Sequence, residues 1–402
     1  MKNIKRLGPF EVLMLSLFAC FLSFLKFNPC RADEFSAVST LKYFCYSDIP
    51  VFWVSRALEY HTWPFAFSQV AQLGTTINPV EYPVLVGFVI WLLSYLTDTS
   101  GVAHVNYFDV NVIFLSLLFA TTCIYLYRIK QKYIGLILFT PAVIMALFIN
   151  WDMWAVLPTI LAIYYFDRLK ITVSGIFLAV AVSAKFYPVV LLIPTLIILV
   201  KNKDYPRLRK YLISFLITYL ILNLPFMITD FKGWRFFFDL SFNRGTGYGS
   251  IWEVFTIIGL SLSHLNVYYA LSSILVFITV SIFFWKNSRV YKLHEIAFLF
   301  VFAFTVFSKV YSPQYVLWLT PLAILAINSK RQLKAFVLWQ IFELIYHIAI
   351  WRYFYLLGGG QVMTGVSPET YALISFTRLL TMTFFAWSIV SPILRIKSKL
   401  SN

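Results

Sequence analysis

Long runs of apolar residues alternate along the whole chain with short clusters of lysine and arginine. A helix that crosses a bilayer needs about 20 mostly apolar residues, because each residue advances the helix by only about 1.5 Å. On this pattern we expect helical spans near residues 10–27, 107–127, 133–149, 153–166, 171–184, 188–200, 211–228, 266–285, 294–308, 314–328, 333–350 and 372–393. Two shorter apolar pieces, residues 83–97 and 253–264, are ambiguous by length alone.

Composition excludes most other classes of protein. Of the 402 residues, 60% are hydrophobic and only 12% are charged, whereas soluble domains carry roughly 25% charged residues. So few charges cannot cover the surface of a globule of this size, which excludes a soluble enzyme, a disordered chain and a secreted disulfide scaffold. We therefore expect an all-α polytopic membrane protein, with residues 1–402 forming one domain of about 12 transmembrane helices.

The basic residues predict how the helices are oriented. The net charge of +16 comes from 33 lysines and arginines against 17 acidic residues. In a membrane protein such an excess reflects the positive-inside bias, so no nucleic-acid partner is expected. The strong clusters are Lys2/Lys5/Arg6, Arg128/Lys130/Lys132, Arg168/Lys170, Lys201 through Lys210, Lys286/Arg289/Lys292, Lys330/Arg331/Lys334 and Arg395/Lys397/Lys399. One topology places all of them on the cytoplasmic side, with both termini inside.

That topology creates two long outer loops, at residues 28–106 and 229–265. It requires that residues 83–97 make no net crossing, so we predict a juxtamembrane helix at the outer interface there. The alternative is a plain span followed by a second span. The basic residues before the first apolar run indicate a signal anchor rather than a cleaved signal peptide.

With this orientation, the unusual polar motifs gather on the outer side. They are Tyr46-Ser47-Asp48-Ile49-Pro50, Glu81-Tyr82-Pro83, Asn150-Trp151-Asp152, Ala184-Lys185-Phe186-Tyr187-Pro188, Asn243-Arg244-Gly245-Thr246-Gly247-Tyr248-Gly249 and Lys309-Val310-Tyr311-Ser312-Pro313-Gln314-Tyr315. The inner connections are short and basic, suited only to anchoring. An active site is therefore expected to face outward.

Several of these residues have a structural and a functional interpretation. A charged Lys185 at the apolar boundary costs about 2–3 kcal/mol unless it snorkels to lipid headgroups or binds an anion such as a substrate phosphate. Asp48 and Asp152 either cap a helix or act on a substrate. Trp151 between two polar residues suits stacking on a sugar ring. The outer cations available to an anionic ligand are Lys185, Arg244, Lys309, Arg352 and Arg378.

Cysteines and histidines add little chemistry. Cys30 and Cys45 both fall in the first outer loop and can pair in an oxidising compartment. Cys20 and Cys123 fall within predicted spans and are expected to be packing residues. The five histidines show no metal-ligand spacing, so neither a metal nor another cofactor is expected.

Taken in order, five motifs resemble those of the polyprenol-phosphate-mannose-dependent glycosyltransferases of family 87, within the GT-C superfamily. They are Asp48, Tyr82-Pro83, Asn150-Trp151-Asp152, Lys185-Phe186-Tyr187-Pro188 and Ser312-Pro313-Gln314-Tyr315. The resemblance covers residues 40–330 and rests on order and spacing, since no single motif is specific. Val84 departs from the pattern, because relatives tend to have a second proline there.

The resemblance implies a GT-C-type bundle with juxtamembrane helices in the first outer loop. It implies transfer of a hexose, expected to be mannose, from a polyprenyl-phosphate donor with inversion, on the outer face of the membrane. The acceptor is expected to be a lipid, a lipoglycan or a protein. The chain contains no Asn-x-Ser/Thr sequon, which favours a bacterial plasma membrane over an endoplasmic reticulum.

Roles for individual residues follow from this expectation. Asp48 is predicted to be the general base that takes the proton of the acceptor hydroxyl. Lys185, Arg244 and Lys309 are predicted to bind the donor phosphate, because a fixed cation stabilises the charge that develops as the sugar leaves. Contacts to the sugar or acceptor are expected from Glu81, Tyr82, Asn150, Trp151, Asp152, Tyr187, Tyr311 and Gln314.

Two other functions remain open at this stage. A transporter or flippase of a polyprenyl-linked or glycolipid substrate would fit the membrane helices. Transporters tend to have paired repeats and ionisable residues at mid-membrane, whereas here the carboxylates cluster at one face and no half-to-half symmetry is visible. A scaffold for an envelope complex would not require polar motifs confined to the outer helix ends.

Overall fold

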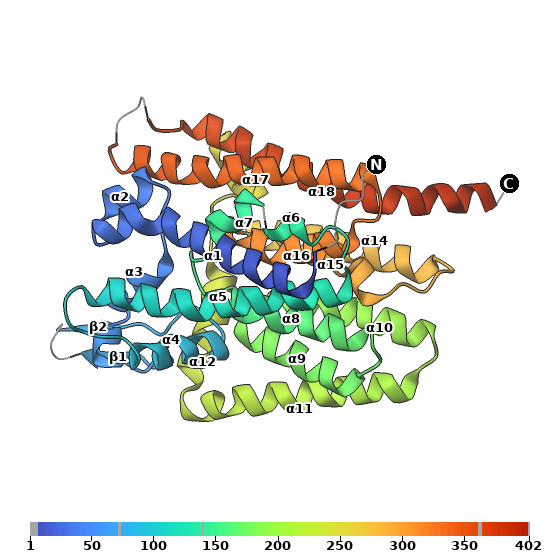
Figure 1. The fold of residues 1–402 in the computed structure, drawn as a ribbon, viewed down its shortest axis with the longest axis horizontal. Coiled ribbons are helices and arrows are strands. Elements are labelled where there is room, and N and C mark those ends of the chain that lie inside the picture. The colour runs from blue at the N-terminus through green and yellow to red at the C-terminus, as the bar shows by residue number, and fades with distance from the viewer. Residues whose placement is uncertain (1–6, 71–73, 139, 361–363, 401–402) are drawn as a thin grey trace.

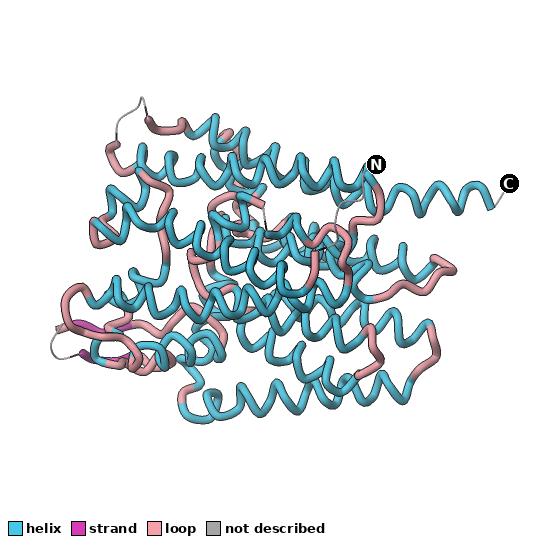
Figure 2. Tube along the Cα trace, viewed as in Figure 1, coloured by secondary structure: helices cyan, strands magenta, loops and turns pink. Residues whose placement is uncertain are grey.

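The computed structural model describes residues 7–70, 74–138, 140–360 and 364–400. Its long helices lie roughly parallel to one another along the long axis of the molecule (Figure 1). Within the described residues, strand pairing is confined to one short hairpin, which Figure 2 shows at one end of the helices. The folded elements of the first long loop gather at that same end.

In the described ranges, six helices are long and apolar enough to cross a membrane. They are α1 (Pro9–Ala32), α5 (Ala103–Ile129), α11 (Tyr205–Thr229), α14 (Leu265–Lys286), α17 (Lys330–Leu357) and α18 (Pro368–Leu400). Only 11% of the apolar window is buried in α11 and α14, against 50% in α17 and α18. Most side chains of the first two are therefore exposed or partly exposed at the surface of the protein. The predicted all-α polytopic membrane architecture is confirmed.

A second set of apolar helices is too short to cross a bilayer alone. It consists of α8 (Met153–Phe166), α9 (Ile171–Ala184), the turn η3 (Tyr187–Leu191) leading into α10 (Leu192–Lys201), α15 (Leu293–Val306), and the turn η4 (Pro313–Tyr315) leading into α16 (Val316–Ala326). The 14 residues of α8 extend only about 21 Å, against a hydrocarbon core of about 30 Å. Most of the side chains of α8 and α16 are buried, so protein surrounds them.

The segment predicted as a span at residues 133–149 is not one continuous helix. It contains two short helices, α6 (Gly135–Leu138) and α7 (Pro141–Ala146), with Thr140 before the second. Pro141 has no amide N–H to donate to the preceding turn, so it starts a helix more readily than it continues one. The apolar run therefore predicted a longer continuous helix than the structure contains.

The first long loop, between α1 and α5, is itself folded. It contains α2 (Ala37–Lys42), α3 (Asp48–Ser55), the turn η1 (Leu58–Tyr60), strands β1 (Ser68–Val70) and β2 (Thr75–Ile77), and α4 (Val84–Ser94). The strands are antiparallel, with Ser68 opposite Ile77. A disulfide joins Cys30 near the end of α1 to Cys45 in the loop. Helix α4, at the predicted juxtamembrane position, has 11 residues and cannot cross a bilayer core by itself.

The second long loop contains α12 (Phe231–Asn243) and α13 (Ile251–Ile257). Helix α12 runs across the direction of the long helices (Figure 1). The Asp230 carboxylate caps it by accepting the Gly233 amide at 2.9 Å. A Cβ atom on Gly233 would lie 1.3 Å from the carbonyl oxygen of Phe65. Only glycine therefore lets α12 sit this close to the first loop.

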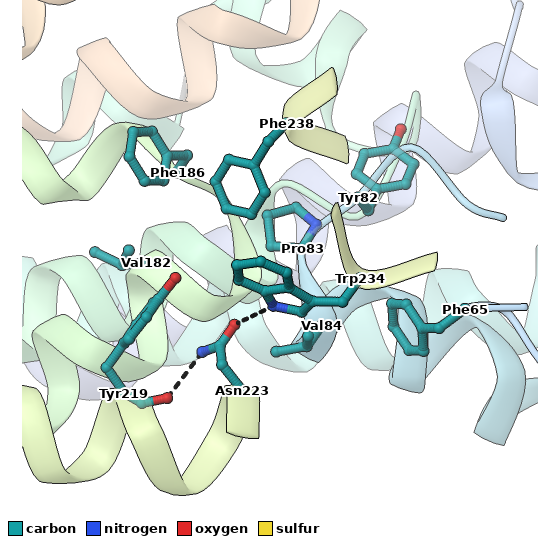
Figure 3. Close-up of a pocket in the computed structure, with 10 residues that line it drawn as sticks. All are labelled: Phe65, Tyr82, Pro83, Val84, Val182, Phe186, Tyr219, Asn223, Trp234 and Phe238. Atoms are coloured by element: carbon teal, nitrogen blue, oxygen red, sulfur yellow. Dashed lines mark hydrogen bonds between the residues drawn. The ribbon is translucent and has the colours of Figure 1, made fainter. Parts of the chain in front are cut away.

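A tryptophan fixes α12 on the other side. Figure 3 shows Trp234 beside Val84, with its indole N–H directed at Asn223 of α11. This N–H donates to Asn223 Oδ1 at 3.2 Å, and the Asn223 amide nitrogen donates to the Ser183 hydroxyl at 3.0 Å. The space between these side chains is only about 10 Å³, too small for a ligand larger than water. The cluster therefore packs α12 against α4 and α11.

Candidate functional site

A cavity of about 850 Å³ opens between the first loop, α12 and the ends of the short helices, a size suited to a small-molecule site. Residues that line it stand just before α8, just after α9, at the start of η3, after α15 and in η4. They are Asn150, Lys185, Tyr187, Ser308 and Gln314. Each short helix thus turns one end toward the cavity. Non-helical backbone at membrane depth is tolerated where it lines such a cavity.

Asp48 is held in place by the chain segment that precedes α8. Its amide donates to the carbonyl of Ile149 at 2.7 Å, and the Ser47 hydroxyl donates to the carbonyl of Phe148 at 2.8 Å. Ser47 also accepts the amide of Ile49 and so caps α3. The capping interpretation of Asp48 is therefore wrong, and its carboxylate is free to line the cavity.

The Asp48 carboxylate has side-chain hydrogen bonds to two tyrosines that line the cavity, Tyr46 and Tyr82. The Tyr82 hydroxyl donates to Asp48 Oδ2 at 3.2 Å. Within the described residues, no salt bridge involves Asp48. Burial raises the pKa of Asp48 above its ordinary value of 3.8, while Tyr46, Lys185 and Tyr82 act in the opposite direction. A carboxylate with a raised pKa is a stronger base than a solvated one.

Tyr82 also connects Asp48 to the nearest cation. The ammonium nitrogen of Lys185 lies 4.6 Å from the centre of the Tyr82 ring, a cation–π contact. The same nitrogen is 2.7 Å from Asp152 Oδ1. The general-base candidate Asp48 therefore contacts the hydroxyl of Tyr82, and the phosphate-binding candidate Lys185 contacts the ring of the same residue.

Asp152 has a different position from the predicted one. Its side chain is fully buried, and it is not among the residues that line the cavity. Its carboxylate makes no capping hydrogen bond to α8. Burial raises the pKa of Asp152, and the adjacent Lys185 ammonium opposes that shift. Asp152 thus lies behind the cavity wall and holds Lys185 in place.

An aromatic stack continues the wall beside Lys185. Tyr187 and Trp318 are parallel, with ring centres 4.3 Å apart and an angle of 6° between the planes. Tyr315 stacks on the other side, with its ring centre 3.7 Å from that of Trp318. All three residues line the cavity. Because Tyr187 and Tyr315 cover both faces of Trp318, the stack fixes the wall beside Lys185.

A second part of the wall carries Lys309, Arg244 and Gln314, all of which line the cavity. The Lys309 ammonium donates to the carbonyl oxygens of Phe242 at 2.7 Å and Arg244 at 3.1 Å. Burial lowers the pKa of Lys309, with a further contribution from the nearby Arg244 charge. The Arg244 side chain is exposed, and within the described residues no salt bridge involves it. Arg244 is therefore the cation most available to an anion.

Glu81 and Tyr82 were both predicted to contact the sugar or acceptor, and they differ in their side-chain partners. Both line it. The Glu81 carboxylate is paired with the guanidinium of Arg56, which leaves Asp48 as the lining carboxylate without a salt bridge among the described residues. Asn150 also lines the cavity, and its Oδ1 accepts the amide of Asp152 at 3.1 Å.

Two other predicted contacts lie away from the cavity. Trp151 is fully buried, and its indole N–H donates to Asn111 Oδ1 at 2.6 Å. Tyr311 is fully buried too, and its hydroxyl donates to Glu343 at 2.7 Å. Neither side chain lines the cavity. Both therefore support the wall from behind.

The two remaining outer cations are also placed elsewhere. Arg352 packs its guanidinium over the ring of Phe44, 4.8 Å from the ring centre. Arg378 is fully buried within the protein. Neither lines the cavity.

The sequence reasoning missed a second aromatic surface of the cavity. Tyr46 and Trp351 stack with ring centres 4.9 Å apart, and Tyr248 packs against Phe354 at 4.3 Å. All four line the cavity. The signal was present as an aromatic-rich stretch at the outer end of the span at 333–350, but aromatic residues at that position are also typical of a membrane interface.

The described residues contain no group of three or more histidine, cysteine, aspartate or glutamate side chains placed to hold a metal ion. Carboxylates and cations both line the cavity of about 850 Å³. The arrangement can therefore remove a proton and hold an anion.

Comparison with known proteins gives a distant structural likeness. No family model matches the chain, and no curated protein matches it. Among solved structures, the chain is similar to ArnT from Cupriavidus metallidurans, whose crystal structure contains undecaprenyl phosphate. The sequences are 13% identical, the TM-score is 0.47, and the alignment covers 96% of this chain and 78% of ArnT.

Proposed function

We propose that this protein is an integral membrane glycosyltransferase of the GT-C type that transfers a sugar from a polyprenyl-phosphate donor. One observation carries the proposal: a single cavity is lined by Asp48, a carboxylate without a salt bridge among the described residues, and by two cations, Lys185 and Arg244. Inverting transfer needs a base for the acceptor hydroxyl and a cation for the departing phosphate. The family resemblance of the sequence supports the finer assignment to family 87 and to mannose.

The donor fits the surroundings of the cavity. A polyprenyl chain is apolar and must lie at bilayer depth, and the lining contains apolar side chains of α12 and α15, such as Phe238 and Phe304. Its phosphate belongs at headgroup level, where Lys185 and Arg244 can donate charge-assisted hydrogen bonds. The ammonium of Lys185 has three N–H donors, so its contact with Asp152 leaves donors for a phosphate oxygen.

Asp48 is the general base in this proposal. The acceptor hydroxyl gives its proton to the Asp48 carboxylate as its oxygen bonds to the anomeric carbon of the donor. The bond from that carbon to the phosphate oxygen breaks, and the electron pair leaves with the polyprenyl phosphate. Since attack and departure take place on opposite faces of the sugar, the product is inverted.

The proposed reaction takes place on the outer face of a plasma membrane. The basic clusters at residues 128–132, 168–170, 201–210, 286–292 and 330–334 lie at the ends of the helices away from the cavity-lining motifs. The disulfide between Cys30 and Cys45 supports the same side for the first loop, because disulfides persist in oxidising compartments. Transport is less favoured, because a carrier needs its central site to be reached from both sides of the membrane.

Transfer by the purified protein tests the proposal. The protein in detergent is incubated with radiolabelled polyprenyl-phosphate mannose and a lipid extract of the cells that produce it, and labelled products are separated by chromatography. We expect mannose to move to an acceptor that the extract supplies, and water or buffer alone to accept little. Parallel reactions with polyprenyl-phosphate glucose and arabinose identify the sugar. If none of the three donors is consumed while the protein remains folded, the proposed function is wrong.

A further inference from the structure

Arg378 is a fully buried cation on α18 that the proposed reaction does not use. Its Nη2 atom donates to two backbone carbonyl oxygens, that of Gly249 at 2.7 Å and that of Tyr311 at 3.0 Å. The guanidinium carbon lies 3.3 Å from the centre of the Tyr346 ring and 3.9 Å from that of Tyr311. A charge buried this deeply is costly in a membrane protein and usually has a specific partner.

The two carbonyls belong to two segments that pair side by side. The Gly247 amide donates to the carbonyl of Lys309 at 2.7 Å, and the Tyr311 amide donates to the carbonyl of Tyr248 at 3.1 Å. Lys309, Gly247 and Tyr248 line the cavity. The paired segments, residues 244–250 and 308–312, therefore form the wall that carries Arg244 and Lys309.

Two acidic side chains, Glu253 and Glu343, contact the same paired segments. The Gly249 amide donates to Glu253 Oε2 at 2.7 Å, so Gly249 is fixed at its N–H by a carboxylate and at its carbonyl by Arg378. Glu343 accepts the hydroxyl of Tyr311 at 2.7 Å and lies 3.7 Å from Arg378 Nη1. Arg378 of α18 and Glu343 of α17 therefore both contact Tyr311, one residue of the paired segments.

Gly249 is shaped for this contact. Its φ angle is +74°, in the left-handed region that favours glycine. A Cβ atom there would lie 2.2 Å from the Tyr346 hydroxyl oxygen, 2.5 Å from the Tyr311 carbonyl oxygen and 2.6 Å from Arg378 Nη2. The loop can therefore approach the guanidinium only because position 249 has no side chain.

We propose that Arg378 is a positioning residue that clamps residues 244–250 to residues 308–312 and so sets where Arg244 and Lys309 meet the donor phosphate. This inference rests on the proposed function for its consequence, but the clamp itself is independent of the substrate. A lysine at position 378 keeps the charge. Its ammonium group is not planar like the guanidinium, so it cannot reproduce the stacking on the rings of Tyr311 and Tyr346.

Hydrogen exchange of the purified protein tests the clamp without any substrate. In Arg378→Lys we expect amides in residues 247–250 and 308–312 to exchange at least about 10-fold faster, because their pairing is no longer held from behind. Amides in the centre of α17 should exchange at the wild-type rate. Arg31→Lys is the matched control, since Arg31 joins α1 to Asp109 of α5 and does not line the cavity. Unchanged exchange in the two segments, or an equal increase throughout α17 and α18, would overturn the proposal.

Kinetics test the consequence for the donor. In Arg378→Lys we expect the KM for polyprenyl-phosphate mannose to rise about 10-fold, the scale of a lost charge-assisted contact, while the KM for the acceptor stays within about twofold. A general loss of structure would move both constants or lower the yield of folded protein. Equal changes in both KM values in a folded variant contradict the positioning role.

Gly249→Ala provides an independent route if Arg378→Lys does not fold. It leaves α18 intact and separates the loop from the guanidinium by steric contact alone. The same faster exchange at residues 308–312 and the same selective rise in donor KM are expected, and a wild-type result for both overturns the clamp. If the wild-type protein transfers no sugar, the proposed function fails, whereas the exchange experiment still decides whether the clamp exists.

Discussion

The two walls of the cavity hold their cations in different ways. On the wall formed with α8 and α9, Lys185 is paired with the buried carboxylate of Asp152 at 2.7 Å, so the two charges cancel. On the wall formed by residues 244–250 and 308–312, Lys309 donates to two carbonyl oxygens and Arg244 is exposed. The first wall therefore supplies fixed hydrogen-bond donors with little net charge, whereas the second supplies positive charge for a phosphate.

Asp48 belongs to the first wall and is expected to give the largest effect. Asp48→Asn is nearly isosteric and leaves the Ser47 cap of α3 in place. Loss of a general base reduces turnover roughly 100- to 10,000-fold, so we expect that range for kcat, with donor binding retained. The measurement is a single-turnover transfer assay with labelled donor. Near-wild-type turnover in Asp48→Asn, with a large loss in Glu81→Gln, would move the role to Glu81.

The Lys185–Asp152 pair predicts the second largest effect. Lys185→Met alone leaves Asp152 buried without its cation, which costs about 3–5 kcal/mol in fold stability. The double variant Lys185→Met/Asp152→Asn removes both charges and should restore the melting temperature. If Lys185 contacts the donor phosphate, the double variant still loses about 2–3 kcal/mol of donor affinity.

The two measurements on this pair separate stability from binding. Thermal unfolding in detergent reports the first, and titration with polyprenyl phosphate reports the second. A double variant that is stable and binds the donor as tightly as the wild type would restrict Lys185 to a structural role. In that case the phosphate would be held by the second wall alone.

Arg244 tests whether net charge is the contribution of the second wall. Arg244→Met should weaken donor binding by about 1 kcal/mol, because the side chain is exposed and its interactions are screened by solvent and salt. The loss should shrink as ionic strength rises, since screening removes the wild-type advantage. Arg235→Met is a matched control, because Arg235 lies on α12, is paired with Asp239 and does not line the cavity. Equal losses in the two variants would show that the effect is not specific to the cavity.

Tyr82 predicts the smallest effect, on the pH dependence of the reaction. The raised pKa of Asp48 means that the base is lost as pH falls through a value above 3.8, so the acidic limb of kcat/KM lies above that value. The Tyr82 hydroxyl bond favours the carboxylate form and lowers the pKa of Asp48. Tyr82→Phe removes this bond but keeps the ring under Lys185, so the limb should move to higher pH. An acidic limb that stays at the same pH, or moves to lower pH, would show that Asp48 is not the group whose titration sets it.

The same burial has an opposite consequence for stability. Because the pKa of Asp48 is raised in the folded protein, the folded state binds a proton more tightly than the unfolded chain does. Stability from this group therefore falls as pH rises from the ordinary value through the raised one. Asp152 acts in the same direction. Activity and stability thus respond to pH with opposite signs at this wall.

Much of the architecture could be predicted from the sequence. The helices at residues 153–166 and 171–184 coincide with α8 and α9, because a run of apolar residues in lipid must satisfy its backbone hydrogen bonds within a helix. The prediction of one span at residues 133–149 was wrong, because Pro141 interrupts the helix while leaving the average hydropathy high. Asp48, Lys185 and Gln314 were expected on the same side of the membrane, and all three line one cavity. That this side is the outer one stays a prediction.

The chemical state of each side chain was not predictable in the same way. Two helices, α8 and α9, lie between Asp152 and Lys185 in the sequence, and the 2.7 Å contact exists only because these helices pack together. Trp151 and Tyr311 belong to motifs at the cavity but point away from it, toward Asn111 and Glu343. A motif fixes the position of a chain segment, whereas side-chain direction depends on the neighbouring elements.

By itself, the sequence determined that this chain folds as membrane helices with its varied polar residues at one end, because hydropathy and charge act through local composition. Only the tertiary structure decided which of those polar residues share a cavity and which neutralise one another behind it. Asp48 is left without a salt bridge among the described residues, Lys185 is paired, and Arg378 is enclosed beneath the wall. The reason is that electrostatic and hydrogen-bond partners act over a few ångströms, and the packing of distant segments alone sets those distances.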